Sequence, residues 1–553
     1  MSNPSLKSTA DGYVRAPYEN DWQGRRSHTG QILEADGTMN FGRRKFLRIS
    51  CGLIGAGLFC NRNTRAHAAE DASRPNILFI GCDDLRTALN CYEKAHIHSP
   101  NIDRLASEGV LFERAYVQQA VCAASRASFL TGCRPDTTGA DYPYSMYFVE
   151  KFLPAHPSLP AYFHRQGYYT RTLGKIHHGY SEDFSEPDFD AKSAQNYALE
   201  ENRKHGKYGP PFEMADVQDN AYRDGILADE TIATMRRATE SGSPFFLAIG
   251  FHKPHLPFCA PQKYWDLYDP AGIDLPANRQ HPENSPPYST WHYELSQYSG
   301  PNDRDGTPVP DDHARALRHG YYACVSYVDA LIGQILDELD RLGLRDNTIV
   351  MFWSDHGFHL GEHAMWCKET NFELDTHAPL IVRAPGIPGG LRSPALVEYV
   401  DMFPTLTELT GIHPPHHLEG TSMVPLLTNP ERPWKDAAFS QYPRGTRIEG
   451  YAMRTDRYRY VEWWNKDSGG ARLDIAAREL YDHDADPMET KNVAVLTENS
   501  ELVRRLSEQL EAGWRFALPE GIRNESHNAP APRSIPWSRK KARWLSEKKG
   551  EEE

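Results

Sequence analysis

Three short apolar runs in the sequence each lead into aspartate or histidine residues. The runs cover residues 76–80, 244–249 and 348–353, and each has the length and composition of a buried strand. The polar residues that follow them, in chain order, are Asp83 and Asp84, then His252 and His255, and then Asp355 and His356. Ligands of open α/β sheets bind beyond the carboxyl ends of the strands. The sequence therefore predicts one site that gathers all three groups.

Helical patterns lie between these strands. Residues 101–109 begin with Asn, end with Gly and place apolar side chains on one face. A further helix closes at residues 128–132, and a long amphipathic helix is expected over residues 313–342. This alternation predicts an α/β fold, in which helices sandwich a large, mainly parallel or mixed sheet.

The alternation stops near residue 430, and residues 451–464 have the pattern of one or two antiparallel strands. We therefore expect a catalytic domain over residues 74–430 and a smaller α+β subdomain over residues 431–520. Residues 521–553 are rich in proline and charge, which is typical of a solvated tail.

The N-terminal region contains a short apolar stretch, residues 49–59, between the basic residues Arg43-Arg44-Lys45 and the small residues of Ala66-His67-Ala68. This pattern resembles a twin-arginine signal peptide over residues 39–68, which implies export to the periplasm or beyond. The alternative is a short buried helix beside a basic turn. Residues 1–38 form a polar extension, and we expect Met39 to be the true start.

Net charge excludes several classes of partner. The 61 Lys and Arg residues against 75 Asp and Glu residues give a net charge of −14, which argues against general binding of nucleic acid or anionic membrane. No apolar run reaches the length needed to span a bilayer. An anionic substrate would therefore need a local positive site.

Asp83, Asp84 and Asp355 would bring three carboxylates to one edge of the sheet. Like charges at close range repel unless a cation separates them. A set dominated by carboxylates favours calcium over magnesium, although His356 is an unusual ligand for a hard ion. The alternative is that these acids cap helices or pair with arginines. His359 and His363 also suggest zinc, but the excess of aspartates argues against it.

The number and spacing of the cysteines exclude some kinds of site and single out Cys122. The chain has nine, of which two lie in the export signal, and none forms a C-x-x-C pair, so a zinc ribbon or a thioredoxin site is not supported. Cys122 stands in Cys122-Ala-Ala-Ser-Arg126 and is followed by Leu130-Thr131-Gly132. By burial statistics alone, a lone cysteine is a small core residue.

This segment resembles the C-x-[PA]-x-R signature of the type I sulfatases, in the alkaline phosphatase superfamily. In that family the cysteine is oxidised to formylglycine, whose hydrate supplies the nucleophilic oxygen. Ala124 stands where proline is commoner. The resemblance runs from about residue 75 to residue 492 and is nearest to the iduronate-2-sulfatase branch. It rests on segments in one order, which are 83–86, 99–103, 119–122, 129–138, 252–255, 355–357 and 361–363.

The resemblance implies roles for individual residues. Asp83, Asp84, Asp355 and His356 would hold one calcium ion, with the modified Cys122 completing the set. Arg126 would hold the aldehyde hydrate, Lys175 and Lys368 would bind sulfate oxygens, and His255 would lie near the leaving oxygen. The family histidine after Lys175 matches His178, with His177 as the competitor.

The expected activity is removal of sulfate from a carbohydrate, most similar to a uronate 2-O-sulfate, after maturation by a formylglycine-generating enzyme. Two alternatives stay open. One is phosphomonoester or phosphonate hydrolysis on the same scaffold. The other is a protein that binds a sulfated glycan without cleaving it, if Ala124 prevents oxidation of Cys122.

Overall fold

The structure is a computed structural model that describes most of the chain between residues 74 and 526. The exceptions in that range are residues 95, 141–151, 154, 179, 181, 183, 192–195, 468–470, 523 and 525. The polar extension 1–38, the start at Met39, the signal at 39–68 and residues 527–553 of the tail lie outside the described residues. Within the part that the structure describes, no helix has the length and apolar character needed to cross a membrane.

A seven-stranded sheet forms the centre of the fold, in the order β11-β2-β10-β7-β1-β5-β3. Strands β3, β5, β1 and β7 are parallel, whereas β10 runs antiparallel to both of its neighbours. The strands are β1 (Asn76–Asp83), β2 (Val110–Tyr116), β3 (Tyr169–Gly174), β5 (Phe245–Pro254), β7 (Thr348–Ser354), β10 (Leu380–Arg383) and β11 (Leu391–Glu398). The predicted mixed α/β fold is confirmed.

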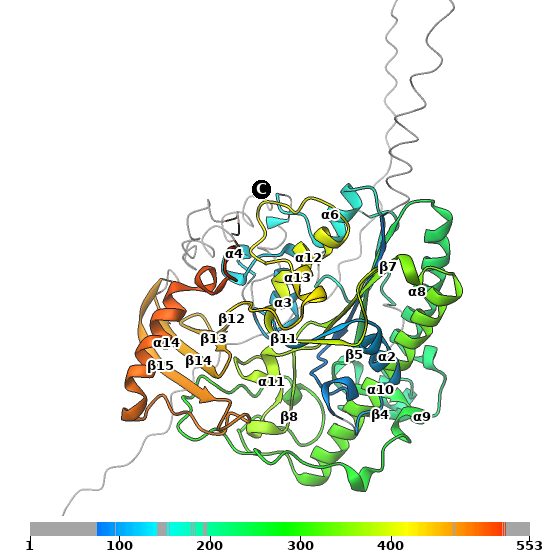
Figure 1. Cartoon of the computed structure of the whole chain (residues 1–553). Coiled ribbons are helices and arrows are strands. Elements are labelled where there is room, and N and C mark those ends of the chain that lie inside the picture. Colours follow the sequence, from blue (N-terminus) through cyan, green and yellow to red (C-terminus); the bar gives the residue numbers. More distant parts are fainter. Residues whose placement is uncertain are drawn as a thin grey trace, which may run out of the picture. The chain divides into compact units, whose positions relative to one another are not determined.

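Helices cover both faces of this sheet (Figure 1) because both faces of its strands are apolar. In β1, Leu78 and Ile80 pack into one apolar core with side chains from α2, α8 and α10, while Ile77 and Phe79 pack into the opposite core. The first group of helices is α2 (Pro100–Glu108), α8 (Arg223–Glu240) and α10 (Asp311–Arg341). The second group is α3 (Cys122–Thr131), α6 (Leu159–Arg165), α12 (Met402–Leu409) and α13 (Val424–Thr428).

The C-terminal part contains a second, antiparallel sheet in the order β12-β13-β14-β15, drawn in orange in Figure 1. Residues 451–464 contribute to two of its strands, as the pattern allowed. The strands are β12 (Ala437–Arg444), β13 (Ile448–Thr455), β14 (Tyr458–Lys466) and β15 (Arg472–Asp482). Helix α14 (Ser500–Ala512) packs against this sheet through Leu506.

Shorter elements connect these layers. They are α4 (Pro135–Thr138), α7 (Glu200–Arg203), β4 (Phe212–Ala215), β6 (Phe258–Pro261), α9 (Gln262–Trp265), β8 (His359–Leu360), β9 (Trp366–Cys367) and α11 (Glu373–Thr376).

Close backbone packing fixes the end of β3 beside β5. The amide of Lys175, directly after β3, donates to the carbonyl of Gly250 at 2.7 Å. A Cβ atom at Gly250 would overlap the carbonyl oxygen of Lys175. Only glycine fits this position, and the contact holds Lys175 at the carboxyl edge of the sheet.

We expect Gly250→Ala to lower the free energy of unfolding by about 1–3 kcal/mol, because the added methyl group forces the two strands apart. Urea denaturation measures this change. Gly272→Ala is the matched control, since a Cβ there meets no atom closer than 3.9 Å. Equal stability of the two variants would contradict the packing argument.

Candidate active site

The carboxyl ends of β1 and β7 place three carboxylates together. Asp83 ends β1, Asp84 follows it, and Asp355 follows β7, its neighbour in the sheet. The backbone N–H of Asp84 donates to Asp355 Oδ1 at 3.1 Å. All three side chains are buried. The structure thus brings Asp83, Asp84 and Asp355 to one edge of the sheet.

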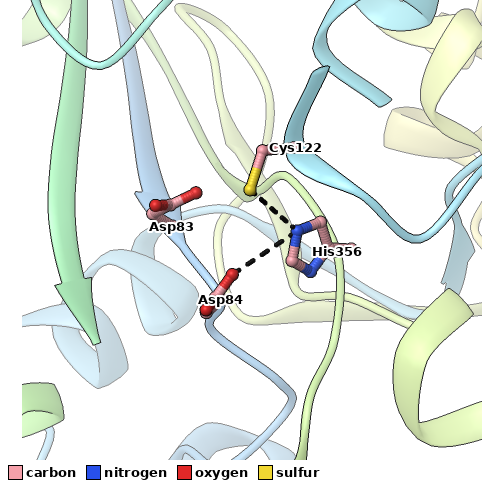
Figure 2. Close-up of side chains that lie close together, drawn as sticks. All are labelled: Asp83, Asp84, Cys122 and His356. Carbon is pink, nitrogen blue, oxygen red and sulfur yellow. Dashed lines mark hydrogen bonds and ion pairs between the residues drawn. The ribbon is translucent and has the colours of Figure 1, made fainter. Parts of the chain in front are cut away.

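Cys122 reaches the same place from the first residue of α3 (Figure 2). Its Sγ lies 3.4 Å from His356 Nε2, and that nitrogen lies 3.4 Å from Asp84 Oδ1. One ligand atom each from Asp83, Asp84, Cys122 and His356 lies within 4.8 Å of the others. Asp355 stands just outside this set, with its Oδ1 3.7 Å from His356 Nε2.

The orientation of His356 suits a metal ligand. Its Nδ1 lies 2.9 Å from the carbonyl oxygen of Gly357, which can only accept a hydrogen bond. Nδ1 therefore carries the proton, and in the neutral ring Nε2 turns a lone pair toward Cys122 and Asp84. A lone pair beside a carboxylate is repulsive unless a proton or a cation lies between them. The carboxylates and this nitrogen fit a divalent cation.

Three cations surround the carboxylates, of which Arg126 and Lys368 are buried and Lys175 is partly exposed. Arg126 donates to Asp355 Oδ2 at 2.9 Å and to Asp83 Oδ1 at 3.3 Å. Lys175 forms an ion pair with Asp83, and Lys368 Nζ lies 2.9 Å from Asp84 Oδ2. These contacts supply the local positive charge that an acidic chain needs to bind an anionic substrate.

The two adjacent aspartates differ in acidity. Burial opposes ionisation of Asp83, but Lys175, His255 and Arg126 hold its pKa well below the usual value. Burial raises the pKa of Asp84, and Lys368 offsets this only in part. The site therefore contains one firmly ionised carboxylate beside one that a further cation would help to ionise.

His178 and His177 occupy different surroundings. Burial, then Lys175 and Arg126, lower the pKa of His178 to about 3, so its ring is neutral near pH 7. His178 Nδ1 is buried and has no hydrogen-bond partner among the described residues. His177 instead lies 3.5 Å from Glu182 and stacks on Phe184. These surroundings favour His178 over His177 as the family histidine that follows Lys175. The role of His178 in the reaction stays a prediction.

His359 and His363 form hydrogen bonds with other residues and do not contact the charge cluster, by which we mean Asp83, Asp84 and Asp355 with Arg126, Lys175 and Lys368. His359 contacts Asp375 Oδ1 at 2.6 Å through Nδ1 and His363 Nδ1 at 3.1 Å through Nε2. The other nitrogen of His363 lies 2.9 Å from the carbonyl oxygen of Met488. Each ring nitrogen already has a partner, which argues against zinc binding by these two histidines.

Glu294 is a site residue that sequence reasoning missed. Its Oε2 lies 2.7 Å from Lys368 Nζ, and its Oε1 lies 3.1 Å from His255 Nε2. Burial opposes its ionisation, but Lys368 and His255 lower its pKa. Glu294 precedes a short 3-10 turn in a loop, where no strand end or motif signals it.

Comparison with known proteins decides the family. The sequence model described as Sulfatase matches residues 75–412, and a model described as N-sulphoglucosamine sulphohydrolase, C-terminal, matches residues 361–515. The chain belongs to the sulfatase family. This sulfatase is accordingly a sulfuric ester hydrolase, and the resemblance found in its motifs is confirmed.

Iduronate 2-sulfatases are among its relatives. The protein from Mus musculus is 34% identical over 530 residues, which cover 79% of this chain and 94% of the relative. The protein from Homo sapiens is 34% identical over 523 residues, with coverage of 78% and 92%. A sulfatase from Formosa agariphila is 30% identical over 463 residues, with coverage of 79% and 86%.

Solved structures share the fold. A protein in complex with its substrate, D-glucosamine-2-N,6-O-disulfate, aligns with a TM-score of 0.65 and 23% identity, covering 83% of this sulfatase and 99% of that chain. The phosphonate monoester hydrolase of Agrobacterium radiobacter also aligns with a TM-score of 0.65, at 24% identity and with coverage of 79% and 95%.

We expect Lys368→Met to lower kcat/KM at least a hundredfold, because loss of one preoriented donor to a developing charge costs about that much. It should also destabilise the fold by about 3–5 kcal/mol, since Asp84 and Glu294 lose a buried partner. Steady-state kinetics and chemical denaturation measure the two effects.

Lys435→Met is the matched control. Lys435 is another buried lysine between two carboxylates, at 2.9 Å from Glu398 and 2.8 Å from Asp401. Its loss should destabilise the protein similarly, while the folded fraction keeps its kcat/KM. Similar losses of kcat/KM in both variants would mean that Lys368 has only a structural role.

Proposed function

We propose that this sulfatase removes the 2-O-sulfate of a uronate in a sulfated carbohydrate, with formylglycine at residue 122 and one calcium ion. The observation that carries the proposal is that Cys122, two aspartates and His356 lie together, with the cations Arg126, Lys175 and Lys368 around them. The names of the iduronate 2-sulfatase relatives support the choice of sugar.

The state of Cys122 supports its conversion. Burial and then Asp83 raise the pKa of its thiol well above the ordinary value, so the unmodified side chain stays protonated and is a poor nucleophile. As formylglycine, residue 122 would supply a hydrated aldehyde, with one hydroxyl to attack sulfur and a second to expel sulfate afterwards. Arg126, one helical turn along α3, would hold this hydrate.

Calcium would be held by Asp83, Asp84, Asp355 and His356 together with residue 122. Bound there, the ion would lower the pKa of a hydroxyl on residue 122. The residues of the chain supply the remaining chemistry.

Lys175 and Lys368 face the carboxylates of the charge cluster from two sides and would bind the sulfate oxygens, on which charge increases during attack at sulfur. The unpartnered Nδ1 of His178 would contact the same group. His255, held by Glu294, would donate a proton to the departing sugar oxygen.

The proposed function includes export from the cytoplasm. The signal at residues 39–68 would carry a folded protein out of the cytoplasm, so a formylglycine-generating enzyme could act on Cys122 before transit. The site of action would be the periplasm or the exterior.

We expect peptide mass spectrometry to find an aldehyde in place of the thiol of Cys122 in active enzyme, within the segment from Arg114 to Arg126. Cys122→Ser should lose turnover, because a serine adduct has no second hydroxyl to expel sulfate. An unmodified thiol in fully active enzyme would refute the mechanism.

The substrate is tested by measuring sulfate released from defined sulfated mono- and disaccharides. We expect 2-O-sulfated uronates to give the highest kcat/KM. Aryl sulfate and aryl phosphate serve as paired references, and dominant phosphate turnover would favour the phosphohydrolase alternative. Tight glycan binding without sulfate release would favour the non-catalytic alternative.

Calcium binding predicts a gain in stability on adding the ion to chelator-treated protein. At a concentration a hundredfold above Kd the gain is about 2.7 kcal/mol. Asp84→Asn should abolish this gain in thermal unfolding. Asp401→Asn, which removes a buried carboxylate bonded to Lys435, should keep it. A gain that survives in Asp84→Asn would place the ion elsewhere.

A further inference from the structure

Arg444, the last residue of β12, is a half-buried cation with no carboxylate within ion-pair distance among the described residues. Its Nε donates to the carbonyl of Tyr288 at 2.8 Å, Nη2 to that of Ser289 at 3.4 Å and Nη1 to that of Pro443 at 3.2 Å. A guanidinium has five N–H donors, so two remain for a ligand.

Aromatic rings enclose this guanidinium. Its central carbon lies 4.9 Å from the ring centre of Tyr442, 5.5 Å from that of Trp291 and 5.4 Å from that of Trp463. Trp463 is fully buried and donates to Glu479 at 2.6 Å, which fixes the enclosure. Burial lowers the pKa of Arg444, and the charges of Tyr442, Glu369 and Glu479 offset this only in part.

Two contacts tie Arg444 to the active site. Tyr442, whose ring lies beside Arg444, packs against Val121 and Ala124 on either side of Cys122. The loop that accepts hydrogen bonds from Arg444 continues to Glu294, which contacts Lys368 and His255. The surroundings of Arg444 thus include a ring that packs next to Cys122 and a loop that leads to Lys368 and His255.

Exposed aromatic rings lie on this loop. The exposed fraction of Trp291 is 38% and that of Tyr293 is 46%, with their ring centroids 6.5 Å apart. Neither ring is explained by core packing. Exposed aromatic faces beside a few directed polar groups are typical of ligand sites.

We propose that Arg444 binds a second anion of the substrate, the carboxylate of the sulfated uronate, while Trp291 and Tyr293 pack on the sugar. This inference rests on the proposed function. The ester sulfate and the carboxylate project from different carbons of one sugar ring, so a single cation cluster cannot hold both. A planar guanidinium matches a carboxylate in a bidentate pair, and low polarity around it strengthens that pair.

The test compares a 2-O-sulfated uronate with its carboxyl-reduced counterpart, in which a hydroxymethyl group replaces the carboxylate. Wild-type enzyme should prefer the uronate. Arg444→Gln should lower the ratio of the two kcat/KM values about ten- to a hundredfold, mainly through the KM of the uronate, because a charged hydrogen bond is lost. Arg444→Lys should give an intermediate ratio.

Arg472→Gln is the matched control. Arg472 also stacks on aromatic rings of the C-terminal sheet, 3.8 Å from Tyr451 and 5.6 Å from Trp464, but it lines a separate cavity beside α14. Its substitution should leave the ratio at the wild-type value. Thermal unfolding of all variants identifies any loss of fold.

Three results would overturn the inference. Equal turnover of the two sugars by wild-type enzyme would mean that no residue binds the carboxylate, although the proposed function would stand. An unchanged ratio in Arg444→Gln would assign Arg444 a structural role. Release of sulfate from neither sugar, with turnover of other sulfate esters, would refute the proposed function and this inference together.

Discussion

Mutual compensation of buried charge is the constraint on which this structure depends. Asp83, Asp84 and Asp355 could not share one buried edge without Arg126, Lys175 and Lys368 around them. Each cation comes from a different element, so the charge cluster also holds α3, the end of β3 and the segment after β9 in place. The same ion pairs therefore stabilise the fold and arrange the charged groups of the active site.

Local pattern was enough to predict the centre of the fold. Strands β1, β5 and β7 are buried on both faces, and such strands appear in a sequence as uninterrupted apolar runs. The shared edge then follows from parallel strand direction, which explains why the sequence alone groups Asp83, His255 and Asp355. Individual roles came from the resemblance to sulfatases rather than from pattern.

The remaining strands and contacts have weaker signals. Strand β2 interrupts its apolar run with Glu113 and Arg114, and β10 has only four residues, so neither stands out from surrounding sequence. Glu294 and Arg444 are distant in sequence from the motifs and reach the site through irregular loop and hairpin geometry. Tertiary packing alone shows that Glu294 contacts Lys368 and that Arg444 lies beside Tyr442, which packs on the residues next to Cys122.

The contact of Tyr442 with Val121 and Ala124 joins the C-terminal sheet to the helix that begins with Cys122. In the proposed function the ester is cleaved at the edge of the large sheet, whereas Arg444 and the loop with Trp291 and Tyr293 would contact the sugar. Mutation could therefore reshape substrate choice in the small sheet while the reactive centre is preserved. Because the two parts are separate, one fold could evolve to act on many different sulfated polymers.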